Sequence, residues 1–281
     1  MIEQILVYTF ILGGLYSLLA LGFSLIMGVA RVMNLAHGGF YLLTAYFIIS
    51  LLFTGFGIST LISLICIIIV SLVVYKLLIE PMHEKEMNAA VVTLGLVLIF
   101  QEGIKLIFGP EYQSIPYTVT GYVTILGERV VSQKLLAATT AIVLVVALWI
   151  FIRLTKQGKA IRAVAQNMEV ARLVGINISR VVMMSMGISA LLAGVACVLF
   201  APFYVISPTG WVILFRVFPV IILGGLGSLR GMLVASFIIA GIEKIVEFTI
   251  GGGYIVPVIT FSLMLIILFI RPSGLFGHTT K

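Results

Sequence analysis

Long apolar runs, separated by short polar or glycine-containing segments, dominate the chain. A membrane-spanning helix needs roughly 20 mostly apolar residues, and most of the runs approach this length. The runs cover residues 4–27, 40–53, 58–79, 89–108, 135–152, 181–203, 211–226, 232–250 and 254–270. The second and seventh runs are short and either can be re-entrant. We therefore predict an all-α, polytopic helical membrane protein with eight or nine membrane segments.

The composition supports this prediction. Hydrophobic residues make up 62% of the 281 residues and charged residues 10%, whereas a soluble domain is about 45–50% apolar and about 25% charged. These values exclude a disordered chain, a nucleic-acid-binding module and an ordinary soluble enzyme. The start, MIEQILVYTF, lacks the basic region of a signal peptide, and we predict that it opens the first span.

The distribution of Lys and Arg predicts the orientation in the membrane. The whole chain has a formal net charge of +7. Residues 153–180 contain a cluster of basic residues and a single acid, Glu169. Because short cytoplasmic loops are enriched in Lys and Arg, we predict that 153–180 is cytoplasmic. Counting spans back from this loop places 109–134 and the N-terminus outside. The basic residues are Arg153, Lys156, Lys159, Arg162, Arg172 and Arg180.

The residues that catalysis or metal binding would need are missing or scattered. All ten acidic residues are Glu, and Gly158-Lys159 does not belong to a nucleotide-binding loop, because Ala160 follows it. The three histidines, His37, His83 and His278, lie far apart. The two cysteines lie inside apolar runs, where a disulfide is not expected. We predict no catalytic residues and no metal site, which favours part of a transporter or channel.

Two Glu/Lys pairs lie in the apolar runs. Glu102 with Lys105, and Lys244 with Glu247, are each three residues apart and therefore share a helix face. They are either a polar lining for a solute path or pairs that neutralise themselves near the membrane surface, and the second interpretation is favoured.

Two glycine-containing segments are candidates for a translocation path or gate. Asn34, His37 and Gly38 lie between the first two runs, as a broken helix along a cavity or as a plain polar turn. The segment 223–228 either joins two spans or has a packing or gating role, and Gly231 extends it at helix-contact spacing. The candidate residues in it are Gly224, Gly225, Gly227 and Ser228.

The basic loop contains an amphipathic pattern. Apolar residues recur every three or four positions from Ile161 through Ala171 to Leu173 or Val174, which predicts one helix over Lys159–Val174, with Gly175 able to cap its end. Such a helix lies on anionic lipid or presents its apolar face to a groove on a soluble partner. The pattern alone does not choose between these two.

Several of these segments resemble one family. Asn34-x-Ala36-His37-Gly38, followed by Ala45-Tyr46, is similar to the signature of permease subunits of branched-chain amino acid ABC importers, and is closer to the LivH-type than to the LivM-type subunit. The segment 223–228, Gly231 and the terminal Arg271-Pro272-x-Gly274-Leu275-x-Gly277 also match. In the basic loop the matching residues include Gly158, Arg162, Ala163, Asn167, Ala171, Leu173, Gly175, Ile176 and Asn177.

The resemblance implies a type II ABC importer permease-like fold, with 1–281 as a single transmembrane domain. It implies an extracytoplasmic loop at 109–134 and a cytoplasmic coupling loop at 153–180, whose matching residues contact an ATPase. The chain would be a multi-pass protein of a bacterial or archaeal plasma (inner) membrane, importing branched-chain or related amino acids. The implied partners are the lipid bilayer, a second homologous permease subunit, two cytoplasmic ATPase subunits and an extracytoplasmic solute-binding protein, without nucleic acid.

The ATPase subunits would bind ATP, so the resemblance implies no cofactor in this chain and no enzymatic activity of its own. Members of the same family that carry urea or amides are one alternative. A self-contained, ion-coupled secondary transporter or channel is another, and the absence of Asp and of a central buried acid argues against it. A membrane-embedded enzyme has no set of residues to support it.

Overall fold

The computed structural model describes residues 1–82, 86–125, 127–209, 211–271 and 274–276. His83, Pro272, Gly277 and His278 lie outside the described residues. Short 3₁₀ or π turns extend α2, α3 and α8, at Leu52–Thr54, Tyr75–Met82 and Ala201–Phe203. The helices and strands are α1 (Ile2–Ala30), α2 (Ala36–Leu51), α3 (Phe56–Val74), α4 (Glu86–Phe108), β1 (Tyr122–Ile125), β2 (Glu128–Val131), α5 (Ser132–Leu154), α6 (Lys156–Gln166), α7 (Met168–Leu173), α8 (Ile178–Phe200), α9 (Trp211–Gly224), α10 (Leu229–Thr249) and α11 (Ile255–Ile270).

The helices correspond to the predicted runs. Within the described residues, six helices are long and apolar enough to cross a membrane, namely α1 to α5 and α8. Helices α9 and α11 are shorter and apolar. Helix α10 has 21 residues and carries Arg230, Glu243, Lys244 and Glu247 among its apolar positions. These nine helices match the nine apolar runs, which confirms the prediction of a polytopic helical membrane protein.

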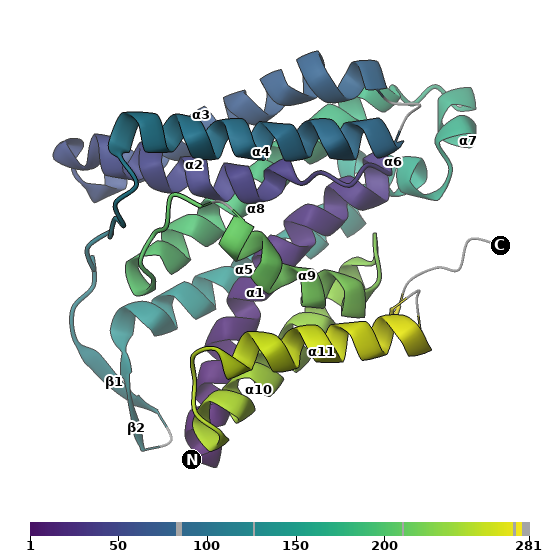
Figure 1. Cartoon of the computed structure of the whole chain (residues 1–281). Coiled ribbons are helices and arrows are strands. Elements are labelled where there is room, and N and C mark those ends of the chain that lie inside the picture. The colour runs from purple at the N-terminus through teal and green to yellow at the C-terminus, as the bar shows by residue number, and fades with distance from the viewer. Residues whose placement is uncertain (83–85, 126, 210, 272–273, 277–281) are drawn as a thin grey trace.

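The molecule has two differently built ends. Figure 1 shows the β1–β2 hairpin near one end of the helices and α6 and α7 at the opposite end, with α2, α3, α4 and α11 running between them. We call these the hairpin end and the α7 end. The connection between α8 and α9 lies at the hairpin end, whereas the α1–α2 and α9–α10 connections lie at the α7 end.

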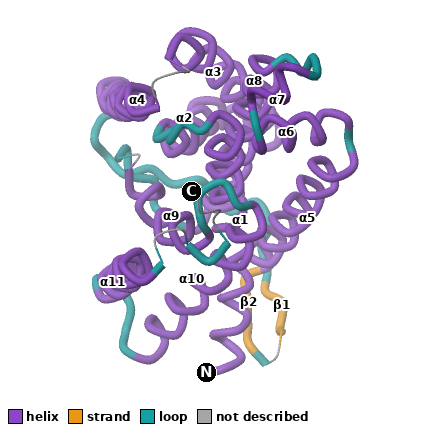
Figure 2. Tube along the Cα trace, turned by 90° about the vertical axis from the view of Figure 1, so that its right-hand side faces the viewer, coloured by secondary structure: helices purple, strands orange, loops and turns teal. Residues whose placement is uncertain are grey.

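Helix α1 forms the centre of the bundle. It is apolar on all sides and packs against α5, α8, α9 and α10, as expected for a helix without a polar face. In its most apolar stretch 89% of the residues are buried, against 22% in α4. Figure 2, which looks along several helices, shows α1 among its neighbours and α4 and α11 at the periphery.

The Glu/Lys pairs lie on the surface of the helices. Nζ of Lys105 is 2.7 Å from a carboxylate oxygen of Glu102, and Nζ of Lys244 is 2.5 Å from one of Glu247. The predicted pairing within each helix face is therefore confirmed.

The segment 109–134 is anchored to the bundle. Its alternating β-branched residues form an antiparallel hairpin in which Tyr122 pairs with Val131. Gln113 and Ile206 exchange two backbone hydrogen bonds of 3.0 and 2.8 Å, which join the segment to the α8–α9 connection. Among the described residues, β1 and β2 form one two-stranded sheet. A sheet this small does not change the all-α class.

Candidate translocation cavity and coupling segment

The predicted coupling residues lie on a tight elbow after α5. Oγ1 of Thr155 accepts a hydrogen bond from the N–H of Gly158 at 2.9 Å and caps the start of α6. A Cβ atom at Gly158 would collide with the backbone of Phe151 and Ile152 in α5. Glycine therefore allows α6 to turn back directly against the end of α5.

The single helix predicted over Lys159–Val174 is wrong: the structure has two helices, α6 and α7, that meet at Asn167. Asn167 has an extended backbone, with φ −156° and ψ 112°, and its Oδ1 accepts from the N–H of Val170 at 3.1 Å. This side-chain cap competes with helix continuation and starts α7 instead.

The predicted cap at Gly175 is confirmed. Gly175 has φ 83°, its N–H donates to the carbonyl oxygen of Arg172, and the N–H of Ile176 donates to that of Ala171. This is the Schellman arrangement, which ends a helix on a left-handed glycine. Asn177 then caps α8, because its Oδ1 accepts from the N–H of Arg180 at 3.0 Å.

The apolar face of the coupling segment is divided between the bundle and the surface. Ile161, Val164 and Ala171 are buried in contact with this chain's own helices. Leu173 is 86% exposed and Val174 is 70% exposed, at the tip of α7. The residues available to a partner are therefore at the tip, whereas most of the predicted apolar stripe is not.

The remaining coupling residues also lie along this elbow. Arg162 is exposed, and its Nη2 donates to the carbonyl oxygen of Arg153 at 3.3 Å, while Ala163 is half-buried. The structure thus brings the nine predicted coupling residues together in one continuous elbow, from Gly158 to Asn177.

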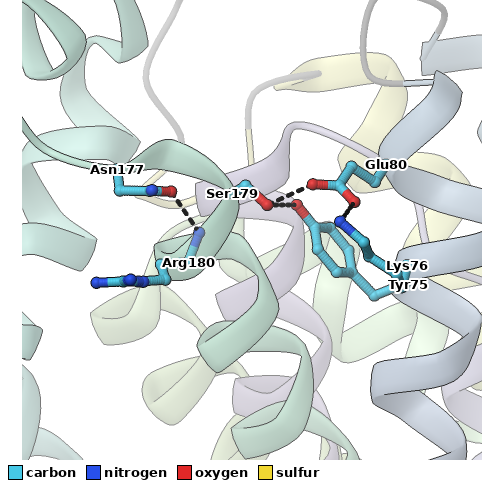
Figure 3. A network of polar contacts seen from close by, with 6 residues as sticks. All are labelled: Tyr75, Lys76, Glu80, Asn177, Ser179 and Arg180. Atoms are coloured by element: carbon cyan, nitrogen blue, oxygen red, sulfur yellow. Dashed lines mark hydrogen bonds and ion pairs between the residues drawn. The ribbon is translucent and has the colours of Figure 1, made fainter.

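A polar network joins the end of this elbow to α3 (Figure 3). Oγ of Ser179, in the first turn of α8, donates to a carboxylate oxygen of Glu80 and accepts from the hydroxyl of Tyr75 at 3.5 Å. Nζ of Lys76 lies 2.7 Å from the other oxygen of Glu80. These hydrogen bonds join the start of α8 to the end of α3.

Asn34 organises the turn between α1 and α2. Its Oδ1 accepts from the N–H of Ala36 at 3.1 Å, and its Nδ2 lies 3.3 Å from the sulfur of Met186 in α8. Helix α2 already begins at Ala36. Asn34 and Leu35 therefore lie in the turn, whereas Ala36 to Gly39 form the first turn of α2, and the placement of the whole segment between two helices is wrong.

His37 is buried and uses both ring nitrogens. Nδ1 lies 3.1 Å from Oγ of Ser189 in α8, and Nε2 lies 3.1 Å from the carbonyl oxygen of Leu19 in α1. A Cβ atom at Gly22 would lie 2.7 Å from the imidazole. His37 thus joins α1, α2 and α8, and the small residue at position 22 makes room for it.

The predicted glycine segment forms the junction of α9 and α10. A Cβ atom at Gly231 would overlap the carbonyl oxygen of Gly224, and a Cβ at Gly227 would lie 3.3 Å from Cα of Gly28 in α1. Gly225 and Gly227 have φ of 87° and 80°, and Oγ of Ser228 accepts from the N–H of Gly231 at 3.1 Å to cap α10. Three helices meet here with their backbones in contact.

A cavity of about 280 Å³ lies between α1, α2, α8 and α9 in the hairpin half of the bundle. The α8–α9 connection contributes Ser207 and Thr209 to its wall, and much of the remainder is apolar. Its other polar lining residues are Tyr16, Tyr41, Tyr204 and Arg216.

A separate narrow gap of about 10 Å³ lies along α1, α2 and α9. His37, Gly38 and Ile221 border it, and Ile213 lines both spaces. Two of the predicted path residues, His37 and Gly38, therefore border this gap. Ile221, which also borders it, lies one helical turn before Gly224. Asn34 lies deeper in the packing of α8, away from the lining of both spaces.

Arg216 and Glu243 are two polar residues at the cavity that were not predicted as site residues from the sequence. Arg216 is exposed on the cavity wall, and its Cζ lies 5.4 Å from the centroid of the Tyr204 ring. Glu243 is 9% exposed, and its carboxylate accepts a hydrogen bond of 2.9 Å from the hydroxyl of Tyr16. The premise that a central buried acid is missing is therefore wrong. An arginine within a short apolar run was the available signal for Arg216.

The amino-acid sequence is similar to those of known membrane transport proteins. A family model described as "branched-chain amino acid transport system / permease component" matches residues 5–270. The chain is 29% identical to the high-affinity branched-chain amino acid transport system permease protein LivH of Salmonella typhimurium, over 95% of this chain and 92% of that protein.

Two further relatives are also permease proteins of branched-chain amino acid transport systems. The LivH protein of Escherichia coli is 28% identical over 95% of this chain and 92% of its own length, and the permease protein BraD of Pseudomonas aeruginosa is 26% identical over 98% and 95%. No solved structure gives a significant match. Because the family model covers nearly the whole sequence, this chain belongs to the family of permease components of branched-chain amino acid transport systems.

Proposed function

We propose that this chain is the transmembrane permease subunit of an ATP-driven importer for branched-chain or related amino acids. The observation that carries the proposal is the contrast between the two ends of one bundle. A cavity suited to a small solute lies in the hairpin half, and an elbow with an exposed apolar tip protrudes at the α7 end. The whole chain, 1–281, acts as one domain that provides the path.

The partners in this proposal are a second homologous permease, two ATPase subunits at the α7 end and a solute-binding protein at the hairpin end. ATP is bound and hydrolysed by the ATPase subunits, and this chain is not an enzyme. The cargo is proposed from the relatives, whose names refer to branched-chain amino acids. The membrane is the plasma membrane of a bacterium or archaeon.

Coupling to the ATPases proceeds through the elbow. Closure of the ATPase pair pushes the tip of α7, and the push reaches α8 through the capped turn 174–177. From there it reaches α3 through the contact between Ser179 and Glu80. Such rigid-body transmission requires constrained joints, and the Asn167 and Asn177 caps and the two backbone hydrogen bonds of the turn at Gly175 supply them.

Transport by the reconstituted system tests the function. The chain purified alone is expected to show no ATP hydrolysis. Proteoliposomes that also contain the second permease, the two ATPases and the binding protein are expected to accumulate labelled leucine only with ATP, and unlabelled urea should not compete. ATP turnover by the isolated chain, or uptake that needs no ATPase subunit, would contradict the proposal.

The same vesicles distinguish the ion-coupled alternative, which the buried Glu243 favours. A secondary transporter would lose uptake when the proton and sodium gradients are collapsed by ionophores. The proposed importer keeps its uptake under those conditions as long as ATP is supplied to the side that holds the ATPases.

The sidedness of the loops follows from the basic segment and has its own test. A cysteine at Lys159, which is exposed on α6, is expected to react with a membrane-impermeant thiol reagent only from the cytoplasmic side. Arg129 on the exposed face of β2 provides the matched position, and its cysteine variant should react only from outside. Labelling of Lys159→Cys in intact cells would reverse the topology.

A further inference from the structure

We propose that the cavity in the hairpin half is a recognition site for the carboxylate of a zwitterionic solute with an apolar side chain, and that Arg216 binds this carboxylate. The inference rests on the proposed function, since it assigns a solute class to the path of an importer. It concerns a residue on α9 that lies outside the glycine segments and the coupling elbow.

Arg216 carries a charge that no salt bridge neutralises in the described part of the chain. An arginine in an apolar membrane helix is costly unless it faces water or a counter-ion. Within the described residues Arg216 forms no ion pair, and its guanidinium lies over the Tyr204 ring. It is exposed on the cavity wall. The planar guanidinium fits a carboxylate with two parallel hydrogen bonds, which makes a carboxylate the natural ligand.

A buried acid, Glu243, contacts the cavity wall through Tyr16. Glu243 interacts electrostatically with Arg216, but its carboxylate is held by the hydroxyl of Tyr16, whose side chain lines the cavity. The site therefore has a cation, Arg216, on the cavity wall and an anion, Glu243, on the other side of the Tyr16 side chain. A solute with a carboxylate and an ammonium group matches both charges and leaves the site neutral, whereas a simple anion matches only one of them.

The remaining wall of the cavity is mostly apolar. Leu12, Leu42, Phe200 and Ile213 contribute apolar surface to the wall. The volume of about 280 Å³ is at the small end of ligand cavities. An amino acid with an aliphatic side chain fills such a space with its carboxylate at Arg216. Urea and amides offer neither the negative charge nor the apolar surface.

Protection of an engineered cysteine tests the site directly. In the complex carrying Cys66→Ala and Cys197→Ala, a cysteine at Ser207, on the cavity wall, is reacted with a small thiol reagent. Leucine is expected to slow this reaction. Leucinamide, which keeps the ammonium and side chain but lacks the carboxylate, is not. Adding Arg216→Gln should abolish the protection, whereas adding Arg129→Gln on the hairpin should leave it intact.

Uptake provides the second measurement. Arg216→Gln is expected to reduce ATP-driven leucine uptake roughly 10- to 100-fold, the loss typical of charge-assisted hydrogen bonds. The uptake rate of Arg216→Lys should lie between those of Arg216→Gln and the wild type, because lysine keeps the charge without the bidentate geometry.

The outcomes separate the two proposals. Protection by leucinamide equal to that by leucine, or protection that persists in Arg216→Gln, would overturn the carboxylate site even if uptake is ATP-driven. Leucine-specific protection that depends on Arg216, in a complex that shows no ATP-driven uptake, would support the site and contradict the importer. Wild-type uptake by Arg216→Gln would also count against the site.

Discussion

Replacing Gly231 with alanine is expected to destabilise the protein strongly, because the new methyl group has no space. It would overlap the carbonyl oxygen of Gly224 and lie 2.8 Å from its carbonyl carbon. Both obstacles belong to backbone, which cannot rotate away as a side chain can. Overpacking costs typically about 1–3 kcal/mol. We expect the upper part of that range, seen as a melting temperature lowered by roughly 5–10 °C in detergent.

Gly241→Ala is the matched control on the same helix. A methyl group there would lie 3.6 Å from Cγ2 of Thr9, an ordinary contact. Because alanine favours a helix over glycine by up to about 1 kcal/mol, this variant should melt at the wild-type temperature or slightly above it. Gly224→Ala, which meets Gly231 from the other side at 2.8 Å, should behave like Gly231→Ala. Equal melting of Gly231→Ala and Gly241→Ala would refute close backbone contact at this junction.

Replacing Leu173 with glutamate is expected to abolish transport without unfolding the chain. Leu173 is 86% exposed at the tip of α7, so the substitution removes no internal packing. If the tip inserts into an ATPase groove, a buried carboxylate there costs the 2 kcal/mol or more typical of an interface hot spot, or roughly a 30-fold weaker assembly. Co-purification of the ATPases and ATP-driven leucine uptake measure the effect.

Two variants provide the controls. Leu173→Met keeps an apolar tip and should retain assembly and uptake. Gln157→Glu adds the same charge to an exposed position of α6 away from the tip and should also remain active. Ala171 is a poor probe of docking, because it is 2% exposed and a larger residue would disturb the seat of α7 itself. Normal uptake by Leu173→Glu would exclude this tip from the contact with the ATPases.

Local sequence patterns predicted the structure correctly where it is determined by interactions between residues close together in the sequence. The apolar runs predict the nine helices, because lipid requires each span to satisfy its backbone internally. The pairs Glu102/Lys105 and Lys244/Glu247, and the cap at Gly175, depend on residues within one or two helical turns. The break at Asn167 is also local, but an apolar periodicity that continues across it favours one helix, and a single side-chain cap reverses that outcome.

The candidate cavity could not be predicted in the same way. The Tyr16–Glu243 hydrogen bond joins residues 227 positions apart, and no pattern within one helix indicates it. Arg216 has a visible signal in sequence, yet only the fold shows that it faces a cavity. The roles of the coupling residues and of Asn34, His37 and Gly38 remain predictions. Their positions explain the local residue types, since His37 needs Gly22 beside it and the elbow needs Gly158.

The central position of α1 has a consequence for biosynthesis. Helix α1 ends at Ala30 and its main neighbour α10 begins at Leu229, so α1 is made long before the surface that covers it. During that interval the hydroxyl of Tyr16 has not met Glu243, and Gly28 has not met the glycine loop. A chain interrupted before α10 would leave these groups facing lipid. The insertion of α10 therefore completes the cover of α1, and nascent chains that stop before it are expected to be recognised as unfinished and degraded.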